Sequence, residues 1–224
     1  MRYKCLFVDH DDTAVDSTST VHYPAHIAAM KRLRPDRRPV SLEGWFLKNF
    51  DPGIMEYLRG ELRLSEAELA EETRIWRQHT RSGNPPFFPG FVEALREFRR
   101  RGGRIVVISH SEEDTVLRHY RRTGFAPDLV FGWTDDEARR KPSPWPVRTA
   151  LRRFGLSPED ALVVDDLRPG VLMARRAGVA SVAAGWCHSI PPIARFMEEH
   201  CLRLLRTVDE LERFLLDGGS GGFG

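Results

Sequence analysis

The sequence predicts an α/β protein whose core is a doubly wound parallel sheet, and three observations support that prediction. Short apolar runs recur along the chain, and helical patterns with capping signals separate the later runs. Three of the runs end in carboxylates or a hydroxyl. Strands and helices that alternate at this spacing are typical of a parallel sheet with helices on both faces. Ligands of such sheets bind at the carboxyl ends of the strands, so the polar run ends are candidates for a functional site.

Six apolar runs are the candidate strands. They are short and rich in Val, Ile, Leu and Ala, as strands covered on both faces usually are. We expect five buried parallel strands and one edge strand, at residues 3–8, 104–109, 128–131, 161–165, 179–183 and, for the edge, 202–205.

Helical patterns lie between the later runs. Glycines mark where four of them end, because glycine readily adopts the left-handed conformation that closes a helix. Ser111 is expected to cap the helix that follows it, and Thr207 with Glu210 forms a capping box. The expected helices cover residues 90–101, 112–123, 144–154, 169–177 and 207 to about 216.

A long insertion follows the first strand. The chain between the first two strands is too long for a simple crossover, and residues 17–83 carry helical signals without strand alternation. Helix starts are expected at Pro24, Ser41, Asp51-Pro52 and the capping box of Ser65 and Glu68. We therefore divide the chain into a core (residues 1–16 and 84–217), an all-helical insertion (residues 17–83) and a flexible tail (residues 218–224).

Composition argues against several classes of protein. Of the 224 residues, 41% are hydrophobic, and no apolar run is long enough to span a bilayer. The net charge of +2 is too small to indicate a nucleic-acid partner. The three cysteines are few and odd in number, which argues against a disulfide-bonded protein. Asp9 interrupts the first apolar run, where the apolar segment of a signal peptide would continue. We predict a cytoplasmic protein without a membrane partner.

Two carboxylates directly follow the first strand. The run Cys5–Val8 continues into Asp9-His10-Asp11-Asp12-Thr13. Carboxylates two positions apart at the end of a buried strand repel each other and lose hydration, and a bound cation is the usual compensation. This pattern predicts a metal ion and a charged substrate at this strand end.

Three further motifs follow in order: Ser109 at the end of the second strand, Lys141-Pro142, and Asp165-Asp166 at the end of a later strand. With these pieces the sequence resembles the haloacid dehalogenase superfamily of phosphohydrolases, whose signature is a nucleophilic Asp, Ser or Thr, Lys and an acidic pair. Phe88-Pro89-Gly90-Phe91 also matches its phosphoglycolate-phosphatase-like branch. The resemblance implies a Rossmann-like core and makes the helical insertion a cap that closes over the site.

The resemblance also implies catalytic roles. Asp9 is the candidate nucleophile that forms an aspartyl-phosphate, and Asp11 is the candidate general acid and base. Ser109 would donate its hydroxyl and its backbone N–H to the transferring phosphoryl group. Lys141 would neutralise charge on Asp9 and on the phosphoryl oxygens.

Mg²⁺ is the implied cofactor, because a phosphate and a carboxylate repel each other and a hard dication offsets that repulsion. Asp9 and Asp166 are the expected side-chain ligands, and Asp11 would contribute its backbone carbonyl. This register comes from matching Asp166–Gly170 to the family's acidic loop. Asp165 would then bind the metal through water or orient its ligands.

Some positions depart from the family pattern or remain open. Asp12 stands where the family usually has glycine, so we expect strain if its φ is positive. His10 and His110 directly follow catalytic positions and are candidate substrate contacts. His22 and His26 have a spacing that metal ligands use, but one face of a helix is the favoured interpretation.

The preferred function is a Mg²⁺-dependent phosphatase that acts on a small phosphorylated metabolite. A phosphosugar mutase of the same superfamily and a non-catalytic phosphometabolite-binding or regulatory protein are the alternatives. A dehalogenase is disfavoured because it has no use for the acid/base at Asp11. Lys48, Arg59 and Arg63 are generic anion-binding candidates in the insertion, and the substrate and the oligomeric state are left open.

Overall fold

The computed structural model describes residues 2–216, and the flexible tail predicted at 218–224 lies outside this range. Six parallel strands form one sheet in the order β3-β2-β1-β4-β5-β6. Each strand lies within two residues of its predicted limits, which confirms the doubly wound α/β fold. The strands are β1 Cys5–Val8, β2 Arg104–Ile108, β3 Leu129–Phe131, β4 Ala161–Asp165, β5 Ala180–Ala184 and β6 Leu204–Leu205.

The strand order reverses at β1, and this reversal positions the site. β1 pairs with β2 on one side and with β4 on the other, so that Val8 is in register with both Val107 and Val164. The carboxyl ends of these three strands therefore lie next to one another. Loops that leave neighbouring strands in opposite directions open a crevice, which is where doubly wound sheets bind ligands.

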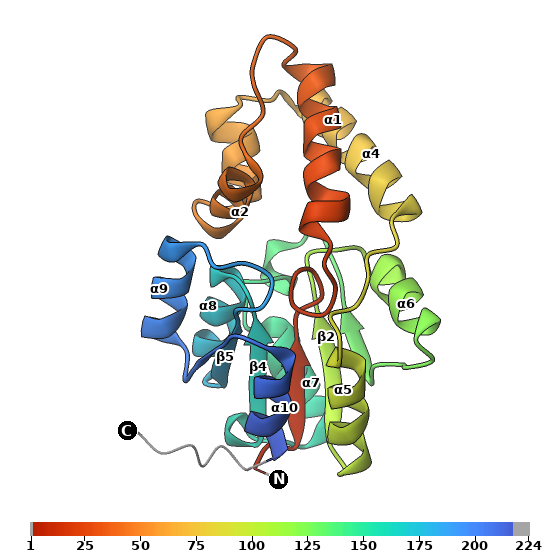
Figure 1. Cartoon of the computed structure of the whole chain (residues 1–224), viewed down its shortest axis with the longest axis vertical. Helices are drawn as coiled ribbons and strands as arrows, with labels where there is room; N and C mark the ends of the chain where they lie inside the picture. The colour runs from red at the N-terminus through yellow and green to blue at the C-terminus, as the bar shows by residue number, and fades with distance from the viewer. Residues whose placement is uncertain (1, 217–224) are drawn as a thin grey trace. The chain divides into compact units, whose positions relative to one another are not determined.

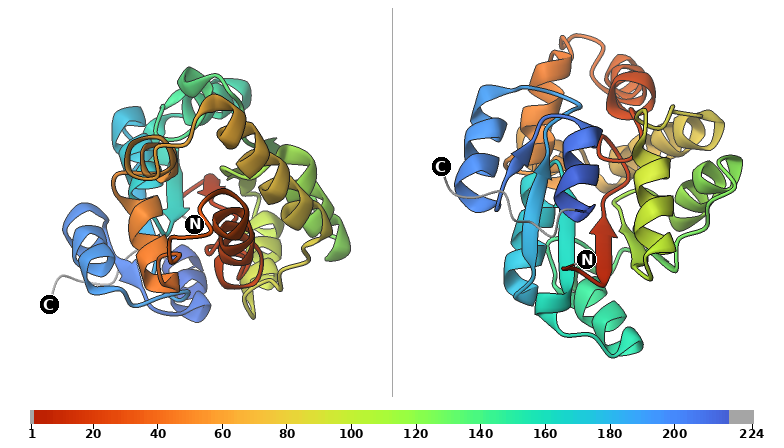
Figure 2. Two further views of the ribbon diagram at one scale, coloured as in Figure 1. Left: turned by 90° about the horizontal axis from the view of Figure 1, so that it is seen from above. Right: turned by 60° about the horizontal axis from the view of Figure 1, so that its bottom comes forward.

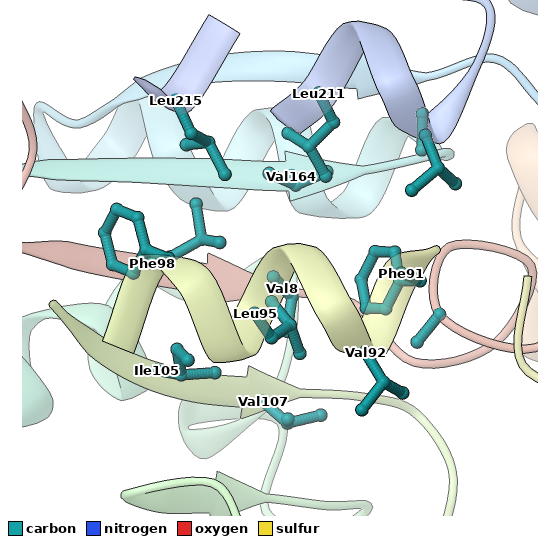
Figure 3. Close-up of a cluster of buried hydrophobic side chains, with 14 of the residues drawn as sticks. Val8, Phe91, Val92, Leu95, Phe98, Ile105, Val107, Val164, Leu211 and Leu215 are labelled. Carbon is teal, nitrogen blue, oxygen red and sulfur yellow. The ribbon is translucent and has the colours of Figure 1, made fainter. Parts of the chain in front are cut away.

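Helices cover both faces of the sheet (Figure 1). On one face, α5 and α10 pack their apolar residues against β1, β2 and β4, as Figure 3 shows for Leu95 and Leu211 above Val8 and Val164. In the right-hand view of Figure 2, the same two helices flank β1, which is visible between them. α7 and α8 cover the other face. The helices are α5 Phe91–Arg100, α6 Glu113–Arg122, α7 Trp145–Phe154, α8 Arg168–Ala177, α9 Pro191–His200 and α10 Val208–Leu216, with 3₁₀ turns η3 Glu137–Arg139 and η4 Pro158–Asp160.

Two details of the helices differ from expectation. α9 was not predicted, although two prolines occupy its first positions, where a missing N–H costs nothing. Ser111 was expected to cap α6, but the N-cap residue is Glu112. The Ser111 hydroxyl instead donates to the Asp11 carboxylate, a charge-assisted hydrogen bond.

The chain divides into two compact units, which we call the insertion unit, Asp16–Pro86, and the core unit, which holds the rest. The insertion unit contains helices and no strand, and its interior is built from residues such as Met30, Trp45 and Leu69. Its elements are η1 Thr18–His22, α1 Tyr23–Leu33, α2 Leu42–Phe50, α3 Ile54–Glu56, η2 Tyr57–Glu61 and α4 Glu66–Ser82.

The capping predictions within the insertion unit hold. The Ser41 hydroxyl accepts from Gly44 N–H at the start of α2, and Ser65 and Glu68 form the complete capping box of α4. The third helix begins at Ile54, after Gly53 rather than at Asp51-Pro52. Among the described residues, none of the helices has the length and apolarity that crossing a membrane requires.

His22 and His26 have separate roles in the insertion unit. The Trp76 indole donates to His22 Nδ1 at 3.1 Å. His26 is 2% exposed, and its ring stacks on Trp45 with 4.2 Å between centroids. Burial lowers the pKa of His26 to about 4, so this ring is neutral at neutral pH. Both histidines therefore serve packing and hydrogen bonding, the interpretation that the sequence favoured.

Candidate active site

The loop that leaves β1, residues 9–15, is a tight turn, and we call it the β1 loop. Its first amide, Asp9 N–H, donates to Val164 O at 2.9 Å. His10 O then accepts from the amides of Ala14 and Val15 at 2.9 and 3.0 Å, so one carbonyl closes the turn. Asp12 has φ 61°, and this confirms the positive φ considered for it. A non-glycine residue costs roughly 1 kcal/mol or more in that region, and Asp tolerates it better than most.

Lys141 bridges two carboxylates from different strands. Its Nζ donates to Asp9 Oδ1 at 2.5 Å and to Asp165 Oδ2 at 2.9 Å, and all three side chains are buried. Burial raises the pKa of Asp9 well above its ordinary value, against the opposing effect of the Lys141 ammonium. Burial lowers the pKa of Lys141, but the two carboxylates outweigh it and raise that pKa overall. The ammonium is therefore charged throughout the neutral range.

The adjacent carboxylates Asp165 and Asp166 have different surroundings. Asp165 is fully engaged, because its second oxygen accepts from Leu167 N–H at 3.0 Å in addition to the Lys141 contact. Gly170 packs so closely against Asp165 that a Cβ there would lie 1.9 Å from Oδ2. Asp166 Oδ1 accepts from the Thr13 hydroxyl at 3.1 Å, whereas its buried Oδ2 has no hydrogen-bond partner among the described residues.

These acidic residues fit a hard dication. One oxygen each from Asp9, Asp165 and Asp166 lie within 4.8 Å of one another, and all three residues are buried. One ammonium cannot balance three clustered carboxylates, and Asp166 Oδ2 has no hydrogen-bond donor among the described residues, with His188 Nε2 3.8 Å away. Oxygen donors of this kind are the ligands that Mg²⁺ prefers. The arrangement favours Asp166 over Asp165 as the direct ligand, as the sequence register does.

Asp11 lies against the loop that leaves β2, residues 109–112, which we call the β2 loop. The hydroxyls of Ser109 and Ser111 donate to Asp11 Oδ2 at 3.0 and 2.7 Å. Ser111 N–H donates in turn to Ser109 Oγ at 2.9 Å. Sequence reasoning missed Ser111, although its position two residues after Ser109 was a signal that both hydroxyls belong to one loop.

One predicted donor is not available. Ser109 was expected to offer its backbone N–H to a phosphoryl group, but that N–H donates to Phe131 O at 2.9 Å, as part of the β2–β3 pairing. The next amide along, that of His110, makes no backbone hydrogen bond among the described residues. A strand amide at the last paired position is used by the sheet, so the first amide outside the pairing is the one free to bind an anion.

His110 and His10 do not have equivalent positions. His110 Nε2 donates to Lys141 O at 3.0 Å, and burial, followed by the charge of Lys141, lowers its pKa to about 4. His110 therefore holds the Lys141 backbone as a neutral ring. The His10 side chain is 0% exposed and contacts His119, so its predicted contact with substrate is not supported. His10 lies between Asp9 and Asp11, and its side chain points into the protein interior, on the opposite side of the extended segment.

The family assignment rests on the sequence as well as the fold. The family model for haloacid dehalogenase-like hydrolases matches residues 3–178. The chain belongs to this hydrolase family. The match covers all four motifs, and the family resemblance read from them is confirmed.

Curated relatives and a solved structure agree with this assignment. The chain is 30% identical over 96 residues to pyrophosphatase PpaX of Bacillus pumilus, and the aligned stretch covers 42% of this chain and 44% of that protein. It is 25% identical over 186 residues to hexitol phosphatase A of Escherichia coli, covering 82% and 83%. The structure of a β-phosphoglucomutase homologue from Bacteroides vulgatus superposes with a TM-score of 0.76 at 19% identity, over 97% of this chain and 90% of that one. The chain thus spans about half the length of the first curated relatives it matches, and the structural match shows the fold.

Proposed function

We propose that this hydrolase is a Mg²⁺-dependent phosphatase that cleaves a small phosphomonoester through an aspartyl-phosphate on Asp9. The observation that supports it best is the pairing of Asp9 with Lys141 beside a buried Asp166 oxygen that lacks a donor. A carboxylate that is held by an ammonium and surrounded by acidic residues is suited to attack an electrophile that arrives with a cation.

The proposed reaction has two displacements. In the first, an Asp9 carboxylate oxygen forms a bond to phosphorus while the bond from phosphorus to the leaving oxygen breaks, and Asp11 gives its proton to that oxygen. In the second, Asp11 takes a proton from water as the water oxygen attacks phosphorus. The bond between phosphorus and Asp9 then breaks, which releases inorganic phosphate and restores the carboxylate.

Three groups of the chain would stabilise the phosphoryl oxygens. Lys141 contributes a full positive charge, and the Ser109 hydroxyl and the His110 amide contribute hydrogen bonds. The Ser109 hydroxyl now donates to Asp11, so binding a phosphoryl oxygen requires it to exchange that partner. The exchange removes one of the two hydroxyls that donate to Asp11 Oδ2, and the Ser111 hydroxyl keeps Asp11 in place.

The metal would be held by Asp9 and Asp166 side chains and by the Asp11 carbonyl, with Asp165 orienting the site through Lys141 and Leu167. When bound, Mg²⁺ supplies the positive charge that allows a carboxylate and a phosphate to approach each other. The closed shape around Asp165, which Gly170 makes possible, keeps these carboxylates in place.

Substrate choice is assigned to the insertion unit as a cap. The generic anion candidates there are already paired in part, because Lys48 contacts Glu61 and Arg59 contacts Glu66 within the same unit. These two ion pairs weaken the case for Lys48 and Arg59 as substrate ligands. The third candidate, Arg63, has a backbone φ of 52°, in the left-handed region. The names of the relatives, a pyrophosphatase and a hexitol phosphatase, indicate small phosphorylated compounds as the panel to test.

The test is phosphate release from small phosphomonoesters and pyrophosphate, with Mg²⁺ or with EDTA, for wild type and Asp9→Asn. Release that requires both Mg²⁺ and Asp9 supports the proposal, and the best substrate defines the class. Conversion of a sugar phosphate to its isomer without phosphate release would instead establish the mutase. Mg²⁺ binding without turnover of any compound would favour a binding or regulatory protein and overturn the proposal.

A further inference from the structure

The β1 loop and the segment after β2 are joined at two points. The first is the contact of Asp11 with the hydroxyls of Ser109 and Ser111. The second is a buried pair of histidines, His10 of the β1 loop and His119 of α6, the helix that directly follows the β2 loop. The proposed mechanism uses the first point and leaves the second unexplained.

The histidine pair is close and fully enclosed. His10 Nε2 lies 2.9 Å from His119 Nδ1, and the exposed fractions of the two residues are 0% and 3%. The rings stack with 5.2 Å between centroids at an angle of 27°. Phe87 and Tyr120 contact the His10 ring from other directions, with centroids at 6.2 and 5.6 Å. Burying two polar rings in an apolar interior costs free energy, and the hydrogen bond between them offsets part of that cost.

The direction of this hydrogen bond follows from a third residue. Arg118 Nη2 lies 3.1 Å from His119 Nε2, and a guanidinium can only donate. His119 Nε2 is then the acceptor, so a neutral His119 carries its proton on Nδ1. That N–H donates to His10 Nε2, which leaves the His10 proton on its own Nδ1. The chain of donors therefore runs from Arg118 through His119 to His10.

His10, whose ring is held by His119, lies at the centre of the hydrogen bonds that close the β1 loop. The carbonyl of His10 accepts both amides that close the β1 loop, and the two proposed catalytic carboxylates, Asp9 and Asp11, lie on either side of it. Holding the His10 ring thus limits rotation of the backbone that carries both carboxylates. A displacement of about 1 Å in such groups is enough to reduce the rate by about 10²-fold.

The two joints behave differently during the proposed reaction. The Ser109 hydroxyl must leave Asp11 to bind a phosphoryl oxygen, so the first joint loses one of its two hydrogen bonds in every cycle and keeps the one from Ser111. The histidine pair takes no part in the proposed proton and phosphoryl transfers, so the reaction does not require it to open. We propose that His119 is a positioning residue that keeps the β1 loop in place against α6 while the hydrogen bond between Ser109 and Asp11 is broken. This inference rests on the proposed function for its effect on rate, but not for the hydrogen-bond direction.

The hydrogen-bond direction is tested without turnover. Long-range ¹H–¹⁵N spectra of the wild-type protein, labelled at histidine, report which ring nitrogen carries the proton at neutral pH. We expect Nδ1–H with an unprotonated Nε2 for both His10 and His119, with the signals assigned from spectra of His119→Asn. Protonated Nε2 on either ring, or a doubly protonated ring, would overturn the chain of donors.

The effect on catalysis is tested with three variants. His119→Leu removes the donor, and we expect kcat to fall about tenfold or more with little change in KM. His119→Asn keeps an N–H near the position of Nδ1 and should restore kcat to within about threefold of wild type. Tyr120→Phe is the matched control on α6, because it removes a buried hydroxyl that has no hydrogen-bond partner within residues 2–216 and leaves the ring beside His10. Its kcat should equal that of wild type.

Each outcome bears on a separate statement. Equal losses in His119→Leu and His119→Asn, or an unchanged kcat in a folded His119→Leu, would overturn the positioning role. If His119→Leu does not fold, His119→Asn and Tyr120→Phe still decide, because a positioning donor predicts near wild-type kcat for both and Nδ1–H on His10 in the Asn variant. A wild-type protein that releases no phosphate would reject the proposed function and leave the proton positions as measured.

Discussion

The carboxyl edge of the core sheet and the interior of the insertion unit are both buried, but they bury different groups. The edge holds a buried cluster of three carboxylates with one ammonium, and one Asp166 oxygen has no hydrogen-bond donor among the described residues. The insertion unit buries Met, Trp, Tyr and Leu side chains, together with His26 as a ring stacked on Trp45. Burying unbalanced charge costs folding free energy, whereas apolar packing provides it. The difference identifies the edge as the part of the chain that is organised for chemistry.

The largest expected effect concerns the nucleophile at the edge. Asp9→Asn should lower kcat at least about 10³-fold, because an amide cannot form the phosphoryl intermediate. The amide oxygen still accepts from Lys141, so the melting temperature should change little. Phosphate release and thermal unfolding are the measurements. Turnover close to that of wild type would show that Asp9 is not the nucleophile.

The second prediction separates the adjacent carboxylates. Asp166→Asn should weaken Mg²⁺ binding, measured by calorimetry, about 10–100-fold, because it alters the oxygen that lacks a donor. Asp165→Asn should weaken Mg²⁺ binding less, because the two oxygens of Asp165 already accept from Lys141 and from Leu167 N–H. The reverse order of Mg²⁺ affinities would place the metal on Asp165.

The third prediction tests the apolar interior through pH. The pKa of His26 is about 4 in the folded protein and about 6.5 when unfolded, so the unfolded state takes up the proton first as pH falls. The stability due to the neutral ring is present above pH ~6.5 and is lost between about 6.5 and 4. Between pH 7 and 4.5, urea unfolding of wild type should lose roughly 2–3 kcal/mol more than that of His26→Leu. Equal losses would mean that His26 is not a source of this pH dependence.

The smallest expected effect concerns strain at the edge. Asp12→Gly relieves a positive φ but makes the unfolded chain more flexible, so the unfolding free energy should change by less than about 1 kcal/mol. Activity should be preserved or raised, because glycine is the usual family residue there. A large loss of kcat in a stable Asp12→Gly protein would assign Asp12 a role in the reaction that strain does not explain.

Local chemistry explains why so much of the fold was predictable. Buried parallel strands are continuous apolar runs, and a capping box such as that of Ser65 and Glu68 spans only three residues. Both can therefore be predicted from residues that are close together in the sequence. The motifs at Asp9, Ser109, Lys141 and Asp165-Asp166 were identified from their order along the chain and from its resemblance to the haloacid dehalogenase superfamily. α9 was missed because it follows a loop without a capping side chain and no glycine marks its end.

The sequence by itself determined which residues meet at the carboxyl edge, because strand ends of a parallel sheet share that edge whatever else the chain does. Only the tertiary structure decided which hydrogen-bond partner each of these residues has. Ser109 N–H donates within the sheet, and the Ser111 hydroxyl donates to Asp11 instead of capping a helix. His10 is hydrogen-bonded to His119, which lies 109 positions away in the chain. Hydrogen-bond partners depend on distances between segments that no local pattern encodes, and a donor used by one partner is not available to another.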